Sequence, residues 1–334
     1  KQTKKLIFIY LNNRSFTIRI MFSLTSKLNS FKPNYKGKVG FIGLGQMGSR
    51  MVTHLKDKCD QLFVYDVVPE SVEALVSSNG ALAGATKCDS VADVAKNCDV
   101  VLTMLPASKH VQGVYTEMIP HLKKGAFCVD SSTIDPSVIA DISKTAKEHE
   151  ITVIDAPVSG GVGGAEMGTL TFMVGAEDEQ FEAAEAFLDP MAKAVVHCGA
   201  TGTGQAAKLS NNLVLSMHMI GISEGMNLGI KLGIKPEKLA NIFNMSTARC
   251  WSGDTYNPYP GIIQGVPSSN DYNGGFGAKL MKKDLGLALN AASEVSAQTK
   301  LGERAKEIYD RMSEGEMQDK DFSGVFKLIQ ENKE

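Results

Sequence analysis

Residues Lys38–Gly48 read KVGFIGLGQMG, and this stretch decides the fold expected for the first half of the chain. Its apolar start, Lys38–Ile42, predicts a buried strand, and a GxGxxG sequence follows directly. In such a sequence Gly43 allows a tight turn, Gly45 lets the backbone approach a pyrophosphate, and Gly48 lets a helix lie close to the strand. Residues 49–56 have the texture of that helix, whose free N–H groups favour phosphate.

An acidic residue stands where a dinucleotide-binding turn needs one. Gln61–Tyr65 predicts a second strand, and Asp66 follows it, 18 residues after the last glycine of the turn. An acid at this spacing accepts hydrogen bonds from the ribose hydroxyls of NAD. Because Val67–Val68 comes next, with no Lys or Arg to bind a 2′-phosphate, we expect NAD rather than NADP. The alternative role for Asp66 is a cap on a helix that starts near Pro69.

Further strands alternate with helical stretches such as 136–149. The expected strands are 99–103, 126–129 and 151–155. This alternation predicts a mostly parallel sheet, in which ligands bind at the carboxyl ends of the strands. Three polar or glycine-bearing segments directly follow these strands and are candidate pocket loops, although ordinary turns are the alternative: Leu105-Pro106, Ser131–Thr133 and Ser159–Gly161.

The second half of the chain has helical texture only. Gly204–Gly233 predicts one helix of about 30 residues, so apolar and rich in small residues that we expect it to be buried nearly all round. Lys208 and Asn212 lie four apart on one face of it, and a Lys in such a helix is costly without a partner or a task. Further helices are expected at Pro236–Met245, Gly277–Ser296 and Lys300–Ser313.

These patterns define the expected fold class and domains. We predict an α/β Rossmann-type domain at 37–200, followed by an all-α domain at 201–334 that begins with a long interdomain helix. Residues 1–36 are basic, free of acids and rich in Ser, Asn and Thr, which is typical of a mitochondrial transit peptide and predicts a matrix location. A basic tail without a targeting role is the alternative.

Charge and composition exclude other classes of protein. The chain has 35 Lys and Arg against 37 Asp and Glu, and residues 1–36 hold eight of the basic ones, which leaves 27 against 37 in the body. An acidic body argues against a nucleic-acid partner. The longest uncharged runs contain Gly, Ser, Thr or Asn, so we expect no membrane span. The six cysteines are never closer than ten residues apart and the histidines are scattered, so we expect no metal site.

Four motifs in order resemble those of the 3-hydroxyisobutyrate dehydrogenase family, a branch of the β-hydroxyacid dehydrogenases. They are Val39–Met47 (VGFIGLGQM), Asp155–Thr169 (DAPVSGGVGGAEMGT), Gly202–Asn212 (GTGQAAKLSNN) and Phe276–Leu285 (FGAKLMKKDL). The resemblance runs from about Lys38 to about Lys327. It implies NAD-dependent oxidation of 3-hydroxyisobutyrate to methylmalonate semialdehyde in valine breakdown. The small apolar residues of the long helix further suggest a homodimer or homotetramer.

The resemblance also assigns roles to residues. It implies that Lys208 is the catalytic lysine, that Asn212 is its partner on the substrate, and that Lys283 closes over cofactor and substrate. The substrate pocket it implies is formed by Ser159, Gly160, Gly161 and Thr133. The cofactor-binding set it implies is Gly43, Leu44, Gly45, Gln46, Met47, Gly48, Asp66, Leu105, Pro106, His110 and Thr133, together with Lys283. Similar enzymes usually carry Asn at the position of His110, and either side chain can donate a hydrogen bond.

The chemistry of the residues agrees with these roles. Oxidising an alcohol requires a hydride acceptor and a group that takes the hydroxyl proton. A Lys with its ordinary pKa of about 10.4 is a poor base at neutral pH, but burial beside a cationic nicotinamide lowers that pKa. Two other readings remain open: a related reductase of glyoxylate, succinic semialdehyde or tartronate semialdehyde, and an inactive relative that serves as a scaffold. The helical part is too short for 6-phosphogluconate dehydrogenase, which shares the fold.

Overall fold

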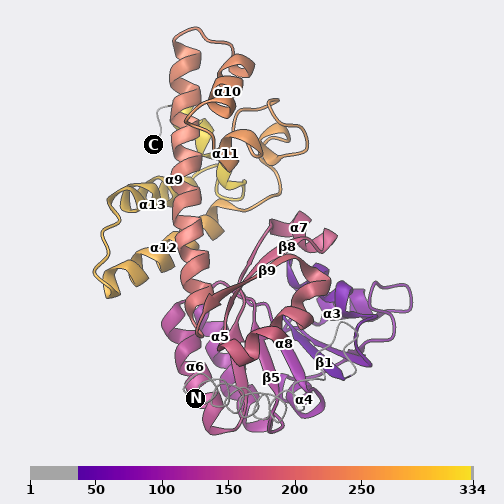
Figure 1. Ribbon diagram of the computed structural model, residues 1–334. Helices are drawn as coiled ribbons and strands as arrows, with labels where there is room; N and C mark the ends of the chain where they lie inside the picture. The colour runs from indigo at the N-terminus through magenta and orange to yellow at the C-terminus, as the bar shows by residue number, and fades with distance from the viewer. Residues whose placement is uncertain (1–36, 332–334) are drawn as a thin grey trace, which may run out of the picture.

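A computed structural model describes residues 37–331, and its first half is built on one large sheet (Figure 1). The order is β3-β2-β1-β4-β5-β6-β8-β7, with β9 paired to β8; the strands from β3 to β6 are parallel, and β8 runs antiparallel to β6 and β7. The strand bounds are β1 Lys38–Ile42, β2 Gln61–Tyr65, β3 Thr86–Lys87, β4 Val100–Thr103, β5 Phe127–Asp130, β6 Thr152–Asp155, β7 Val158–Ser159, β8 Leu170–Gly175 and β9 Ala192–Gly199. The mostly parallel sheet predicted from the sequence is therefore confirmed.

Helices cover both faces of this sheet. They are α2 Gly48–Met51, α3 Pro69–Val76, α4 Val91–Asn97, α5 Ser108–Met118, α6 Pro136–Glu148, α7 Gly161–Met167 and α8 Asp178–Leu188, with 3₁₀ turns η1 Val52–Leu55, η2 Ile119–His121 and η3 Asp189–Met191. One apolar core joins the sheet to α2, α3 and α8, and a second joins it to α4, α5 and α6. Neighbouring residues of β4 belong to opposite cores, Leu102 to the first and Val101 to the second, which explains its continuous apolar sequence.

The second half is helical and is organised around one long helix, α9, which runs along its whole length (Figure 1). The elements are α9 Thr203–Lys231, α10 Pro236–Met245, α11 Trp251–Asp254, η4 Pro267–Ser269, α12 Ala278–Glu294, α13 Lys300–Glu314, η5 Phe322–Gly324 and α14 Val325–Gln330. Helices α10, α12, α13 and α14 pack against α9. The fold class predicted from the sequence, a Rossmann-type half followed by an all-helical half, is confirmed.

Three details differ from the expectations. The helix expected at 49–56 is a single α-helical turn, α2, followed by the 3₁₀ turn η1. Strands β8 and β9, which extend the sheet beyond β6, were not predicted from the sequence. The prediction that the long helix is buried nearly all round is wrong, because the side chains of Val214 and Leu228 are 45% and 62% exposed.

The length and hydropathy of α9 are also those of a helix that could cross a membrane. In the described part of the chain it is the one helix long and apolar enough to cross a membrane by length and composition, with a mean hydropathy of 1.2 over 18 residues. Core helices pass the same test. Since α9 packs against the five other α-helices of this half and buries the polar side chains of Gln205, Lys208 and Asn212, we assign it to the helical core. The expected transit segment, residues 1–36, lies outside the described residues.

Candidate active site

The glycine-rich turn between β1 and α2 has the geometry of a pyrophosphate cradle. Gly43 has a φ of +99°, and a Cβ there would collide with the carbonyl oxygen of Met104. A Cβ on Gly48 would collide with the carbonyl oxygen of Gly43, so this glycine permits the close approach of α2. Gly45 is exposed and nothing lies within 4 Å of the position of its Cβ, which leaves the backbone open to a ligand. The residues present thus fit a dinucleotide.

Asp66 ties this turn to the end of β2. Its Oδ2 accepts a hydrogen bond from the Leu44 N–H at 2.6 Å, and its Oδ1 accepts one from the Val68 N–H at 2.8 Å. The N-cap residue of α3 is Val68, and α3 has no side-chain cap hydrogen bond. Asp66 is therefore not the cap of that helix. Each carboxylate oxygen retains a second lone pair for a ribose hydroxyl. The two other residues of the turn differ in burial: Met47 packs on the first core and Gln46 is exposed.

The loops after β4 and β5 are joined by a buried polar network. The Leu105 N–H donates to Ser132 Oγ at 2.8 Å, and the Ser132 hydroxyl donates to Asp130 Oδ1 at 2.8 Å. The hydroxyl of Thr103 donates to the same oxygen at 2.6 Å. Burial raises the pKa of Asp130 to about 6, against the lowering effect of these donors. Asp130 was not among the sequence candidates, although it directly precedes the candidate loop.

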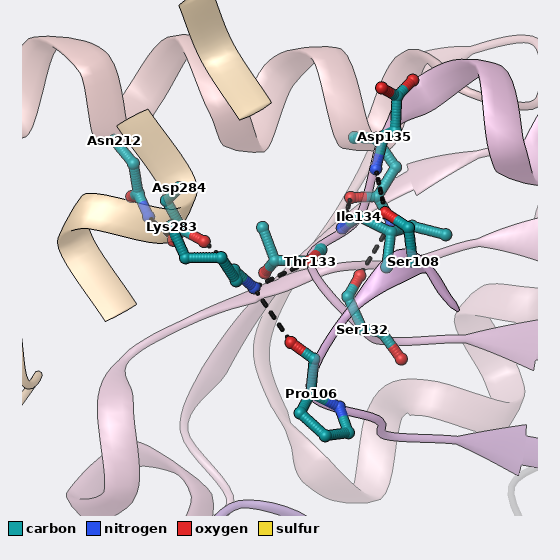
Figure 2. A network of polar contacts seen from close by, with 10 residues as sticks. Pro106, Ser108, Ser132, Thr133, Ile134, Asp135, Asn212, Lys283 and Asp284 are labelled. Carbon is teal, nitrogen blue, oxygen red and sulfur yellow. Dashed lines mark hydrogen bonds and ion pairs between the residues drawn. The ribbon is translucent and has the colours of Figure 1, made fainter. Parts of the chain in front are cut away.

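Lys283 connects the helical half to these two loops (Figure 2). From α12 its Nζ donates to the carbonyl oxygen of Thr133 at 2.8 Å and to that of Pro106 at 3.4 Å. It also lies 3.2 Å from Asp284 Oδ1. Lys283 is therefore not a freely solvated lysine, since its side chain is only 28% exposed and has three polar neighbours.

Lys208 and Asn212 lie on the buried face of α9. Lys208 is 7% exposed, and burial lowers its pKa; Lys283 lowers it further, while Asp284 acts in the opposite direction. The side-chain amide of Asn212 donates to Asp284 Oδ2 at 2.6 Å, and Figure 2 shows the two residues side by side. Reasoning from the sequence missed Asp284, although it directly follows Lys283 in a quoted motif. The same buried face of α9 thus carries an amine of lowered pKa and, one turn further on, an amide bonded to a buried carboxylate.

The segment after β6 provides glycine backbone but stands apart from this network. Ser159 ends β7, pairs with Thr171 of β8, and is half-buried. Gly160 and Gly161 have φ values of +139° and +63°, which favour glycine. Within residues 37–331 no hydrogen bond or ion pair links these three residues to Lys208. His110 is exposed on α5, and the structure does not bring its side chain into the network either.

Among residues 37–331 there is no group of three or more His, Cys, Asp or Glu side chains that could hold a metal ion.

Comparisons with known proteins cover both halves of the chain. Residues 38–199 match a family described as the NAD binding domain of 6-phosphogluconate dehydrogenase. Residues 202–329 match one described as NAD-binding of NADP-dependent 3-hydroxyisobutyrate dehydrogenase. The mitochondrial 3-hydroxyisobutyrate dehydrogenase of Bos taurus is 48% identical over 299 residues, 89% of this chain and 88% of that protein. The human enzyme of the same name is 47% identical over the same length.

Solved structures agree with this assignment. A Mycobacterium tuberculosis 3-hydroxyisobutyrate dehydrogenase, described with L-serine, superposes with a TM-score of 0.82 at 36% identity. The alignment covers 88% of this chain and 99% of that one. With both halves matched and nearly half of the residues identical to those of named enzymes, this chain belongs to the 3-hydroxyisobutyrate dehydrogenase family.

Proposed function

We propose that this protein is an NAD-dependent dehydrogenase that oxidises 3-hydroxyisobutyrate to methylmalonate semialdehyde, a step of valine breakdown. The observation that carries the proposal is the buried amine of Lys208, whose pKa is lowered by burial, in a chain of this family. The presence of Lys208 and of the Asn212–Asp284 pair argues against an inactive scaffold. L-serine, named with the M. tuberculosis structure, is itself a 3-hydroxy acid, which supports that substrate class.

Cofactor binding falls to the turn and loops at the carboxyl edge of the sheet. The backbone of Gly43–Gly48 holds the pyrophosphate, Asp66 the ribose, and Leu105, Pro106 and Thr133 the nicotinamide end. When NAD is bound, its nicotinamide accepts the hydride that leaves the carbinol carbon. The carboxylate of Asp66 and the exposed Val67 favour NAD over NADP, since they offer no cation to a 2′-phosphate. His110, which is exposed on α5, contacts the cofactor in this proposal.

Proton transfer falls to Lys208. Its neutral amine accepts the proton of the substrate hydroxyl during oxidation, and its ammonium returns that proton in the reverse reaction. Asn212 orients the hydroxyl, because the Nδ2 bond to Asp284 fixes the plane of its amide. Lys283 closes the site from α12 over the Pro106 and Thr133 carbonyls.

Substrate anchoring falls to the segment after β6, together with Thr133 of the loop after β5. The side chain of Ser159, the N–H groups of Gly160 and Gly161, and Thr133 bind the substrate carboxylate. A net acidic body offers a carboxylate no general attraction, so local donors on a glycine-rich loop are needed. Ser159 is half-buried, and the positive φ values at the two glycines support an outward-facing backbone there.

The protein is further proposed to be an oligomer of the mitochondrial matrix with a domain boundary at residue 200. The exposed apolar side chains of Val214 and Leu228, 14 residues apart on α9, support a homodimer or homotetramer that covers this face. The mitochondrial names of the relatives and the basic composition of residues 1–36 support a matrix enzyme with a transit peptide. The proposed domain boundary at residue 200 is supported by the end of β9 at Gly199 and the start of α9 at Thr203.

The test is a substrate and cofactor panel. The purified protein is assayed for oxidation of 3-hydroxyisobutyrate with NAD and with NADP, and for reduction of glyoxylate, succinic semialdehyde and tartronate semialdehyde. We expect the highest kcat/KM for 3-hydroxyisobutyrate with NAD. A higher value for any of the three reductions would replace this function by a related reductase, and no turnover at all would favour the scaffold.

A further inference from the structure

Two buried polar side chains, Asp155 and Gln205, fasten the start of α9 to the ends of the sheet strands. Asp155, the last residue of β6, accepts the Gly202 N–H at Oδ1 (2.6 Å) and the Gln205 N–H at Oδ2 (2.7 Å). These N–H groups have no partner within the helix, so the carboxylate satisfies them and complements the helix dipole. Both side chains are fully buried, and neither has a role in the cofactor or substrate binding proposed above.

The side chain of Gln205 then holds the loop after β5 on both sides of Thr133. Its Oε1 accepts the Ile134 N–H at 3.0 Å, and its Nε2 donates to the Ser132 carbonyl oxygen at 2.7 Å. A glutamine has one acceptor and one donor end, and here each end is matched to a backbone group of opposite kind. Gln205 therefore fixes both the distance and the orientation of this loop relative to α9.

Lys208 lies within a closed ring of these contacts. On α9 it lies three residues after Gln205, which is anchored to the β5 loop, and four before Asn212, which is anchored to Asp284 of α12. Lys283 closes the ring from α12 back to the Thr133 carbonyl oxygen (Figure 2). A shift of α9 along its axis would break contacts at both anchors.

Two glycines allow the close packing on which this ring depends. A Cβ on Gly204 would collide with the Met173 carbonyl oxygen and would lie 2.7 Å from Asp155 Oδ2. A Cβ on Gly175 would lie 2.8 Å from the Gly204 nitrogen and collide with Asp155 Oδ1. Any side chain at position 204 would push the start of α9 away from β8 without removing a polar group.

We propose that Gln205, seated on the Asp155 carboxylate, is a positioning residue that sets Lys208 against the Ser132–Ile134 loop. The proposal rests on the proposed function, in which Lys208 moves the proton and that loop binds the nicotinamide end. Because misplacement by about 1 Å can cost a reaction about 100-fold, Gln205 controls kcat while touching neither reactant. Burial raises the pKa of Asp155 to about 7, and the Gly202 and Gln205 N–H groups act in the opposite direction by stabilising its ionised form.

The test compares two unlike perturbations with a matched control. Gln205→Met removes both polar ends at similar length, and Gly204→Ala displaces α9 with every polar group retained. Gly113→Ala, in the interior of α5 where nothing lies within 4 Å of a Cβ, is the control. We expect kcat for hydroxy-acid oxidation at saturating NAD to fall about 10- to 100-fold in both test variants and to stay unchanged in the control. We expect the Kd for NADH and the KM for the hydroxy acid to move less than about threefold.

Hydrogen–deuterium exchange provides a readout that does not depend on turnover. Gln205→Met should speed exchange in peptides covering 132–136 and 202–208 and nowhere else, because the Ile134 amide loses its acceptor. If kcat stays within about twofold while melting temperature falls, the residue is only structural and the proposal is overturned. If the native enzyme turns over no hydroxy acid, the proposed function fails. Unchanged exchange in the two segments would then overturn the positioning role as well, and faster exchange confined to them would support it.

Discussion

Replacing Lys208 by Met should destroy activity and at the same time stabilise the fold. The side chain is 7% exposed, and burial lowers its pKa, so the structure holds an amine where its charged form is disfavoured. Methionine has similar length and no charge, and Asp284 keeps Asn212 and Lys283 as partners after the change. Because only the amine is removed and the carboxylate stays buried, we expect a gain in the free energy of unfolding of about 1 kcal/mol, the low end of the range for whole buried ion pairs replaced by apolar residues. Loss of a general base costs about 10²–10⁴ in rate.

The assay pairs kcat for 3-hydroxyisobutyrate oxidation with thermal melting and NADH fluorescence titration. Lys208→Arg is the control for charge, because arginine remains protonated and cannot accept the proton. We expect both variants to lose turnover, with NADH affinity nearly unchanged. Lys208→Met alone should raise the melting temperature. A Met variant that retains one tenth or more of the native kcat would remove Lys208 from its role, and a Met variant that is also less stable would refute the argument from burial.

The remaining predictions concern specificity, substrate binding, pH and assembly. Asp66→Asn should narrow the ratio of kcat/KM for NAD over NADP, because the repulsive charge is lost while the shape is kept; an unchanged ratio would assign the preference to other residues. Ser159→Ala should lower kcat/KM for the hydroxy acid by about 10- to 150-fold, because one charge-assisted hydrogen bond is lost, and should leave the calorimetric Kd for NADH unchanged. An equal loss of both would place this loop at the cofactor. Since oxidation needs the neutral Lys208 amine and reduction its ammonium, oxidation should rise and reduction fall as pH increases through the lowered pKa; parallel pH profiles would contradict this. Leu228→Asp, on the exposed face of α9, should shift sedimentation velocity toward monomer, and an unchanged oligomer would place the interface elsewhere.

Local sequence was sufficient for the cofactor half of the fold. The strand Lys38–Ile42, the glycine turn and the strand Gln61–Tyr65 have the bounds expected from them, because tight turns and buried strands are determined by a few adjacent residues. The same reasoning placed Leu105, Pro106 and Thr133 at strand ends, and Lys283 contacts that region. The roles of these residues remain predictions.

Long-range contacts could not be predicted from the sequence. Asp155 and Gln205 are 50 residues apart, and nothing in either local segment indicates their hydrogen bond. Asp284 was overlooked because a carboxylate in a KKD sequence is usually solvated, whereas here it is buried against Asn212, 72 residues away. The burial of α9 was overestimated for a related reason: its apolar residues cover more than one face, and only tertiary packing decides which of them meet a neighbour.

Hydride transfer can be followed directly with 3-hydroxyisobutyrate in which both hydrogens of the hydroxyl-bearing carbon are replaced by deuterium. The proposed reaction moves a hydride from that carbon to NAD and a proton from the hydroxyl to Lys208. Mass spectrometry of the reduced cofactor should therefore find one deuterium per molecule of semialdehyde formed. NADH without deuterium, or semialdehyde formed without reduced cofactor, would contradict the proposed dehydrogenase activity.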